Sequence, residues 1–271
     1  MAEIKKILIA NRGEIVQRAI RTIREMGKKS VAVYSAGDKN ASYLKHADEA
    51  VCIGGAKSKD SYLNIPAIIT AAEMTGCDAI FPGYGFLSEN QDFVEICRLH
   101  NIKFIGPSVE VMEKMADKSK AKEEMIRAGV PVVPGSKGSV HSVTEGKKVA
   151  LEIGYPIMAK AAAGGGGRGM RLIKEESEFD QLFMAASSEA LAAFGDGTMY
   201  LERFINNPRH IEVQVVGDSH GNAIHIGERD CSLQRRHQKV IEESPAILLN
   251  DETRAKLHDV AVKATKYLKY E

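Results

Sequence analysis

The stretch KAAAGGGGRGMRLIK, residues 160–174, contains four consecutive glycines and matches the pattern G-x-G-x-x-G at Gly164, Gly166 and Gly169. In a dinucleotide-binding fold this pattern is followed at once by a helix, whose N-terminus receives the pyrophosphate. Here it is followed by MRLIK, in which apolar and polar residues alternate with the period of a strand. The stretch therefore predicts a loop between two antiparallel strands and argues against a dehydrogenase.

The glycine loop also suits the binding of phosphate groups. Lys160 precedes it and Arg168 follows its glycines, and backbone amides without a Cβ can approach phosphate oxygens closely. No Gly-Lys-Ser/Thr ends the loop, which excludes a Walker-type phosphate loop. We predict a flap that folds over phosphates; the alternative is a flexible hairpin tip without a ligand. Lys118 adds a second cation, because it follows Asp117, a predicted helix cap, and so lies at the positive end of that helix.

Composition narrows the class of protein. The 271 residues include 37 Lys+Arg and 36 Asp+Glu without a basic block, which gives nucleic-acid binding little electrostatic support. No apolar run approaches the roughly 20 residues of a membrane span. The four cysteines form no CxxC pair and are typical of reduced thiols, so we expect a cytoplasmic protein with no nucleic-acid or membrane partner.

The first hundred residues alternate between strand-like apolar runs and amphipathic helical segments. This alternation predicts a doubly wound, Rossmann-like parallel sheet. The expected strands are 6–10, 30–35, 78–83 and 103–108, and the expected helices are 14–27, 64–75 and 90–99.

Beyond a linker rich in Pro, Gly and Ser at 128–140, strands dominate. The pattern predicts a helix over 177–191, a strand over 199–205, a β-hairpin over 209–228, and an amphipathic helix over 251–269 with Asp251 as its N-cap.

Two polar stretches follow strand-like patterns. RHIEVQV places His210, Glu212 and Gln214 on one face of a strand. The stretch ERDCSLQRRHQKV, residues 228–240, is strongly cationic at one end, which favours an anion site over a solvated edge. Its polar residues lie within six positions: Gln234, Arg235, Arg236, His237 and Lys239. The histidine is either neutral or charged near pH 7, and Cys231 is interpreted as a buried structural thiol.

Taken together, these motifs resemble the biotin carboxylase subunit or domain of biotin-dependent carboxylases, as in acetyl-CoA carboxylase and pyruvate carboxylase. The matching stretches run from end to end of the chain, and other ATP-grasp ligases lack the ERDCSxQRRHQK run. They are KILIANRGEI, FPGYGFLSEN, FIGPS, AGVPVVPGS, KAAAGGGGRGM, NPRHIEVQV and ERDCSLQRRHQKVIEESPA.

The resemblance implies an α/β protein with a Rossmann-like N-terminal parallel-sheet domain followed by an incomplete ATP-grasp domain, made of a small α+β lid and the start of a larger antiparallel-sheet subdomain. The implied boundaries are 1–114 for the Rossmann-like domain, 115–135 for a linker helix and loop, 136–204 for the lid, and 205–271 for the truncated start of the C-terminal ATP-grasp subdomain. It also implies a reaction in which MgATP phosphorylates bicarbonate to carboxyphosphate, and CO2 then carboxylates N1′ of biotin. ATP, Mg²⁺ and carrier-bound biotin are the implied cofactors and substrates. The implied partners are a biotin carboxyl carrier protein or domain, carboxyltransferase subunits and a second copy in a homodimer.

Residue roles carried over by motif follow the same resemblance. Phosphates would be held by Lys118, Lys160, Gly166 and Gly167; the adenine hinge would comprise Glu202, Arg203, Phe204 and Ile205; and the ribose region would be reached by His210 and Gln234. His237, near the terminal phosphate, and Lys239, on bicarbonate, would be the catalytic residues.

The sequence departs from the family pattern in composition and in length. Phe81 stands where many members have His, Arg203 where many have Lys, and Ala163 where some have a fifth glycine. The family continues beyond Glu271 into strands that carry the Mg²⁺ ligands, so we expect no metal ligand in this chain and no complete carboxylation by it alone. The alternatives are a non-catalytic nucleotide-binding fragment and another ATP-grasp ligase, of the purine-biosynthetic or carbamoyl-phosphate type.

Overall fold

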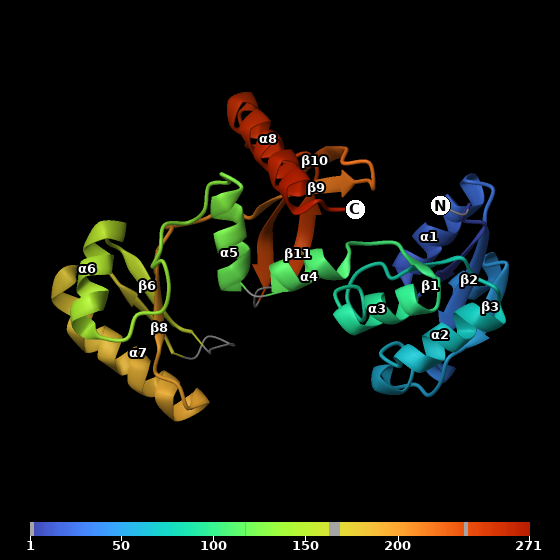
Figure 1. Cartoon of the computed structure of the whole chain (residues 1–271), viewed down its shortest axis with the longest axis horizontal. Helices are drawn as coiled ribbons and strands as arrows, with labels where there is room; N and C mark the ends of the chain where they lie inside the picture. Colours follow the sequence, from blue (N-terminus) through green and yellow to red (C-terminus); the bar gives the residue numbers. More distant parts are fainter. Residues whose placement is uncertain (1–2, 117, 163–168, 236–237) are drawn as a thin grey trace. The chain divides into compact units, whose positions relative to one another are not determined.

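A computed structural model of the chain describes residues 3–116, 118–162, 169–235 and 238–271 (Figure 1). The chain forms two compact units, which are described separately. One contains the residues up to 120 together with 216–223 and 265–271, and the other contains 121–215 and 224–264. The four-part division expected from the sequence stays a prediction.

The first unit is built on a five-stranded parallel sheet with the strand order β3-β2-β1-β4-β5. The doubly wound sheet predicted from the sequence is therefore confirmed. Its strands are β1 (Lys6–Ile9), β2 (Lys29–Tyr34), β3 (Glu49–Cys52), β4 (Ala79–Phe81) and β5 (Lys103–Phe104). Strand β3 was not predicted, because it is largely exposed and so lacks the continuous apolar run of a buried strand.

Helices cover both faces of this sheet, because successive apolar side chains of β1 point to opposite faces and both faces are buried. Leu8 joins a core cluster with Ile68 and Phe93, whereas Ile7 and Ile9 join a second cluster with residues of α1. The α-helices of this region are α1 (Glu14–Glu25), α2 (Ile65–Met74), α3 (Gln91–Leu99) and α4 (Val109–Ala116), and the 3₁₀ helices are Ala36–Asp38, Ser42–His46 and Ser58–Asp60.

Side-chain caps fix where two of these helices begin. The Asn64 carboxamide oxygen accepts the Ala67 N–H at the start of α2, and Asn90 does the same for α3. We expect Asn64→Ala to lower the free energy of unfolding by about 1 kcal/mol, because the orphan N–H loses its partner. Urea unfolding followed by circular dichroism measures this. The exposed turn residue Asn40 provides the control, and a loss in Asn40→Ala equal to that in Asn64→Ala would argue against the cap.

The second unit contains a three-stranded antiparallel sheet with the order β7-β6-β8, which we call the lid sheet. Its strands are β6 (Ile157–Ala161), β7 (Met170–Ile173) and β8 (Met199–Arg203), and α6 (Val143–Ile153) and α7 (Phe179–Phe194) pack beside it, with a 3₁₀ turn over Glu176–Glu178 (Figure 1). The glycine-rich stretch connects β6 to β7, which pair antiparallel, so the predicted hairpin is confirmed. The prediction of a flap over phosphates concerns residues 164–167, which lie outside the described residues.

Helix α6 was not predicted. It begins at a Ser142 cap, whose hydroxyl accepts the Glu145 N–H, but its first turns contain Gly146, a residue that disfavours helices. A Cβ at position 146 would lie 2.7 Å from Phe179 Cζ. The glycine therefore permits a close helix–helix contact that no local pattern could indicate.

A second antiparallel sheet has the order β11-β10-β9, with β9 (Ile211–Gly217), β10 (Ala223–Arg235) and β11 (Gln238–Glu243). The predicted hairpin exists, but its second strand continues to Arg235, and a register shift between Asp230 and Leu233 interrupts its pairing with β11. The remaining helices are α5 (Lys118–Arg127) and α8 (Asp251–Leu268).

The prediction that Asp251 caps α8 is wrong. The Asn250 side chain accepts the Thr253 N–H at 2.8 Å, whereas Asp251 lies inside the first turn. On the predicted apolar face of α8, Leu268 is buried while Leu257 and Val260 are only half-buried. Among the helices that the structure describes, none is long and apolar enough to cross a membrane.

Candidate active site

One polar cluster lies on the lid sheet. Strand pairing places Lys160 opposite Tyr200 and Met158 opposite Glu202, so Lys160, Tyr200 and Glu202 share one face. The opposite face, with Ala159 among its residues, is buried in the lid core. The Lys160 ammonium donates to Glu202 Oε2 at 2.6 Å. The cation predicted to bind phosphate is thus held by a carboxylate in this structure.

Glu202 is ionised although most of its side chain is buried. Burial alone would raise the pKa of this carboxyl, but the hydrogen bond from Lys160 and the neighbouring charges outweigh it, and the pKa lies below its ordinary value. Glu202 Oε1 also accepts the Tyr200 hydroxyl at 3.0 Å. Burial, followed by the Glu202 charge, raises the pKa of Tyr200, so the phenol stays protonated and donates.

The other predicted hinge residues diverge from this cluster. Strand β8 ends at Arg203, whose guanidinium donates to the Ile153 carbonyl at the end of α6. This arrangement places a cation at a helix C-terminus. The backbone N–H of Phe204 donates to Pro156 O at 2.9 Å, and Ile205 is exposed. Arg203 and Phe204 are therefore held by contacts outside the polar cluster, and Glu202 is the predicted hinge residue that contacts Lys160.

A second cluster surrounds Glu212 on the β9-β10-β11 sheet, and we call it the Glu212 cluster. The carboxylate contacts Lys239 Nζ at 2.6 Å, Arg229 Nη2 at 2.9 Å and His210 Nε2 at 3.0 Å. Arg229 also donates to Gln214 Oε1 at 3.0 Å. The predicted polar face of β9 is therefore confirmed, and it brings His210 and Lys239 to one carboxylate.

The charges in this cluster are strongly coupled. The hydrogen bond from Lys239, assisted by Arg229, lowers the pKa of Glu212 to about 2. The same hydrogen bond raises the pKa of Lys239, which is therefore a cation at neutral pH. The motifs did not single out Arg229, although its position two residues before Cys231, on the same face of β10, was a usable signal.

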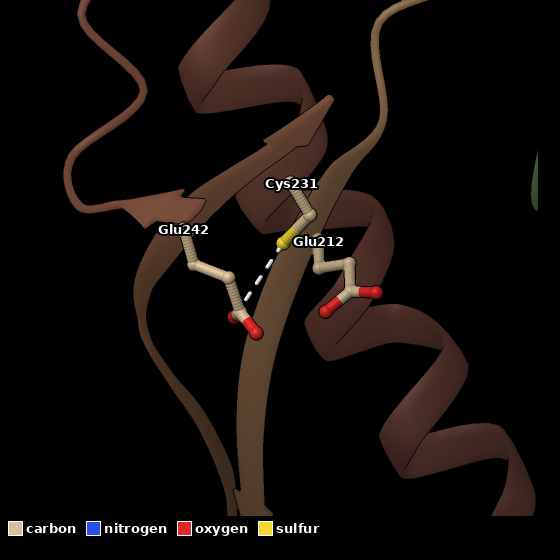
Figure 2. A group of neighbouring side chains, drawn as sticks. All are labelled: Glu212, Cys231 and Glu242. Atoms are coloured by element: carbon tan, nitrogen blue, oxygen red, sulfur yellow. Dashed lines mark hydrogen bonds between the residues drawn. The ribbon is translucent and has the colours of Figure 1, made fainter. Parts of the chain in front are cut away.

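Cys231 lies beside this cluster as a neutral thiol. Figure 2 shows its sulfur directed at Glu242, with Glu212 nearby, and the Sγ–Oε2 distance is 3.6 Å. Burial raises the pKa of the thiol, which agrees with the interpretation of Cys231 as a structural residue. Ligand atoms of these three residues lie within 4.8 Å of one another. However, both carboxylates already form ion pairs with Arg229.

The two residues predicted near the ribose are brought together. His210 Nδ1 lies 2.8 Å from Gln234 Nε2, and Gln234 also donates to the Cys231 carbonyl at 2.9 Å. They line one open pocket, whose walls are formed by Pro208, Arg209, His210, Ile211, Ser232 and Gln234. Gly166, Gly167 and His237 lie outside the described residues, as does the side chain of Lys118.

Other carboxylates of the cationic stretch have structural partners. Asp230 accepts the Ser232 hydroxyl and forms an ion pair with Arg209, and these contacts lower its pKa to about 2. Glu228 is buried and accepts from Arg254 Nε at 2.8 Å and from His258 Nε2 at 2.6 Å. It therefore joins β10 to α8.

The Glu228 contacts predict an acid-sensitive contribution to stability. The Arg254 hydrogen bond, opposed by burial and assisted by His258, lowers the pKa of Glu228 from 4.5 to about 2. A carboxyl group whose pKa is lower in the folded than in the unfolded protein stabilises the fold at pH values above its ordinary pKa. This contribution is lost as the pH falls from 4.5 towards 2. We expect Glu228→Gln to lower the free energy of unfolding by roughly 3 kcal/mol at pH 7.

The difference in free energy of unfolding between Glu228→Gln and the unsubstituted protein should become smaller by about 2 kcal/mol as the pH falls from 5 to 3. Urea unfolding at each pH measures it. Glu252→Gln, which removes an exposed partner of Lys256, should change stability by less than about 0.5 kcal/mol. A difference for Glu228→Gln that does not vary with pH would contradict the ionised role of Glu228.

Comparison with protein-family models assigns nearly the whole chain. Residues 3–112 match the model described as "Biotin carboxylase, N-terminal domain". Residues 117–271 match the model described as "Carbamoyl-phosphate synthase L chain, ATP binding domain".

Curated relatives share the sequence over almost all of this chain. It is 56% identical over 265 residues to a biotin carboxylase of Nostoc sp., which covers 98% of this chain and 59% of the relative. It is 57% identical over 265 residues to a chloroplastic biotin carboxylase of Arabidopsis thaliana, covering 98% and 49%. The chain therefore spans about three-fifths or less of the length of these relatives.

Solved structures agree in fold. A Campylobacter jejuni biotin carboxylase, solved as a beta-gamma-ATP complex, has 67% identity and a TM-score of 0.84, covering 99% of this chain and 60% of the other. The biotin carboxylase domain dimer of Hydrogenobacter thermophilus 2-oxoglutarate carboxylase, solved with MgADP, ADP and bicarbonate, has 49% identity and a TM-score of 0.80. The match covers 100% of this chain and 59% of that one.

Proposed function

Since the chain belongs to the biotin carboxylase family of ATP-grasp proteins, we propose that it forms the ATP-binding portion of an enzyme that carboxylates biotin. In the proposed reaction ATP phosphorylates bicarbonate to carboxyphosphate and leaves as ADP. Carboxyphosphate then splits into phosphate and CO2, and the CO2 carboxylates N1′ of biotin on a carrier protein or domain with loss of the N1′ proton. The observation that carries the proposal is the Lys160–Glu202 pair beside the glycine-rich connection of the lid sheet.

In this proposal Lys160 supplies positive charge to the phosphates of ATP. Lys118, Gly166 and Gly167 complete the phosphate site, and the glycine loop closes over it. Closure excludes water, which protects a labile acyl phosphate from hydrolysis. The segment from Glu202 to Ile205 forms the adenine hinge, which is supported by the backbone contacts that hold this segment in place.

The Glu212 cluster is proposed to bind the second substrate. Lys239 is a cation that shares the Glu212 carboxylate with Arg229, so its ammonium can also stabilise a bicarbonate ion and the charge that develops on it. His237 is proposed to lie near the terminal phosphate. His210 and Gln234, which form one wall of a pocket, are proposed to contact the ribose.

Three carboxylates in or just beyond the cationic stretch do not fit a Mg²⁺ site. Mg²⁺ takes free carboxylate oxygens and water, whereas Glu228, Asp230 and Glu242 are each paired with an arginine. No step is therefore assigned to a metal held by these three residues, and we propose that MgATP receives its protein ligands elsewhere.

The partners and the location belong to the same proposal. We propose a biotin carboxyl carrier protein or domain and carboxyltransferase subunits as partners, and a homodimer as the working assembly. The solved Hydrogenobacter thermophilus domain, a dimer, supports the last point. A cytoplasmic location is supported by four cysteines that are all free thiols in the structure.

Calorimetric titration of the 271-residue chain with MgATP and MgADP tests the nucleotide site. We expect both nucleotides to bind, and MgGTP to bind at least tenfold more weakly, because an adenine hinge presents the wrong hydrogen-bonding groups to guanine. A folded chain that binds neither adenine nucleotide would refute the proposed function.

A further inference from the structure

The motifs assign no role to Lys122, yet its side chain joins the polar cluster on the lid sheet. Lys122 lies on α5, and only 18% of its side chain is exposed. Its ammonium donates to the Tyr200 hydroxyl at 2.5 Å and lies 3.5 Å from Glu202 Oε1. It also lies 5.0 Å from the centroid of the Tyr200 ring, within the range of a cation–π contact.

The backbone leaves space for this ammonium at one position. A Cβ on Gly135 would lie 2.8 Å from Lys122 Nζ and 2.7 Å from the Leu201 carbonyl oxygen. Gly135 also forms an isolated bridge with Glu202. Glycine at 135 therefore allows the lysine and the strand that carries Glu202 to approach each other.

The charges around Glu202 are unequal. One carboxylate faces two ammonium groups, Lys160 at 2.6 Å and Lys122 at 3.5 Å. Tyr200 is a neutral phenol that donates to the carboxylate and accepts from Lys122. The cluster therefore carries one surplus positive charge, which favours an anion such as a polyphosphate.

Binding of that anion creates a problem that a second lysine solves. To contact a phosphate, Lys160 must weaken its hydrogen bond with Glu202. If Lys122 were absent, the largely buried Glu202 carboxylate would then have no cation beside it. Its ionised form would be strongly destabilised, and its pKa would rise. Lys122 is already within ion-pair distance on the other carboxylate oxygen, so it can keep Glu202 ionised while Lys160 contacts the phosphate.

We propose that Lys122 is a positioning residue of the nucleotide site, which holds Glu202 when Lys160 turns towards the phosphates of a nucleoside di- or triphosphate. The inference rests on the proposed role of Lys160 in phosphate binding. It concerns how the carboxylate is held and assigns Lys122 no contact with the phosphates themselves.

Substitution of Lys122 tests this role. Lys122→Met keeps the length of the side chain and removes its charge, and the dissociation constant for MgATP should rise by about tenfold or more. Lys122→Arg should restore binding to within about threefold, because the charge is retained. Lys147→Met is the matched control, because it removes a lysine of α6 that pairs with Asp180. This variant should bind MgATP as tightly as the unsubstituted protein.

Proton uptake separates positioning from a general structural effect. In Lys122→Met, Glu202 should take up a proton when MgATP binds, and calorimetry in buffers of different ionisation enthalpy measures this. The unsubstituted protein should show no such uptake. The Lys122→Met substitution should also be made in a Glu202→Gln background. There it should cost at most half of the MgATP-binding free energy that it costs in the unsubstituted protein, since a neutral amide needs no cation.

Three results would overturn the proposal. Unchanged MgATP affinity in Lys122→Met, together with lost affinity in Lys160→Met, would reject the positioning role and leave the proposed function standing. A loss that Glu202→Gln does not relieve would make Lys122 a direct phosphate ligand. Absence of nucleotide binding by the unsubstituted protein would reject both the positioning role and the proposed function. If Lys122→Met does not fold, Lys122→Gln provides the same comparison.

Discussion

Replacing Lys160 by methionine should weaken MgATP binding by roughly 10- to 100-fold while the chain remains folded. A hydrogen bond to a charged group contributes about 1.5–3 kcal/mol, and each 1.4 kcal/mol is a factor of ten in affinity. The fold should tolerate the change because 38% of the Lys160 side chain is exposed, and because Glu202 keeps contacts with Tyr200 and Lys122.

Calorimetry measures the dissociation constant of Lys160→Met, and circular dichroism checks the fold. Lys174→Met, which removes an exposed lysine just beyond β7, is the control and should bind as the unsubstituted chain does. Unchanged affinity in a folded Lys160→Met variant would remove Lys160 from the phosphate site and, with it, the premise for Lys122.

Replacing Lys239 by alanine should have the larger effect on the reaction itself. In a protein that carries this sequence at the length of its relatives, biotin-dependent phosphate release should fall by about 10²- to 10³-fold, as expected when a group that stabilises developing charge is removed. MgATP affinity should change by less than about threefold. The fold should persist, because Glu212 keeps Arg229 and His210 as partners.

The comparison between turnover and binding decides the assignment of Lys239. Steady-state phosphate release gives the first quantity and calorimetry the second, with the exposed Lys256→Ala variant as control. Equal losses in turnover and in nucleotide affinity would place Lys239 on the nucleotide instead of on bicarbonate.

Elements with a strong period could be predicted from the sequence. The continuous apolar run over Ile7, Leu8 and Ile9, all buried in the structure, and the apolar stripe on α1 correctly predicted a parallel sheet. The alternating stretch MRLIK after the glycines correctly predicted a hairpin. Strand β3 and helix α6 were missed because their local patterns are weak. An exposed strand lacks an apolar run, and Gly146 is explained only by the distant ring of Phe179.

The sequence predicted which residues belong to the candidate site, but it predicted only some of the contacts between them. The motifs singled out Lys160 and Glu202 separately, but their pairing depends on the register of β6 and β8 across 42 positions of sequence. Arg229 and Lys122 were not assigned for the same reason. Each acts through a carboxylate on another element, and a linear pattern does not record such a contact.

If this sequence belongs to the working machinery of a biotin carboxylase, phosphate release from MgATP should depend on both bicarbonate and biotin. The most direct test is steady-state phosphate release from MgATP in a protein of the relatives' length, with bicarbonate present and with biotin added or omitted. We expect release that requires bicarbonate and is stimulated by biotin to a rate on the order of 1 s⁻¹ or more. Release that proceeds equally well without biotin would contradict it and would favour another ATP-grasp ligase.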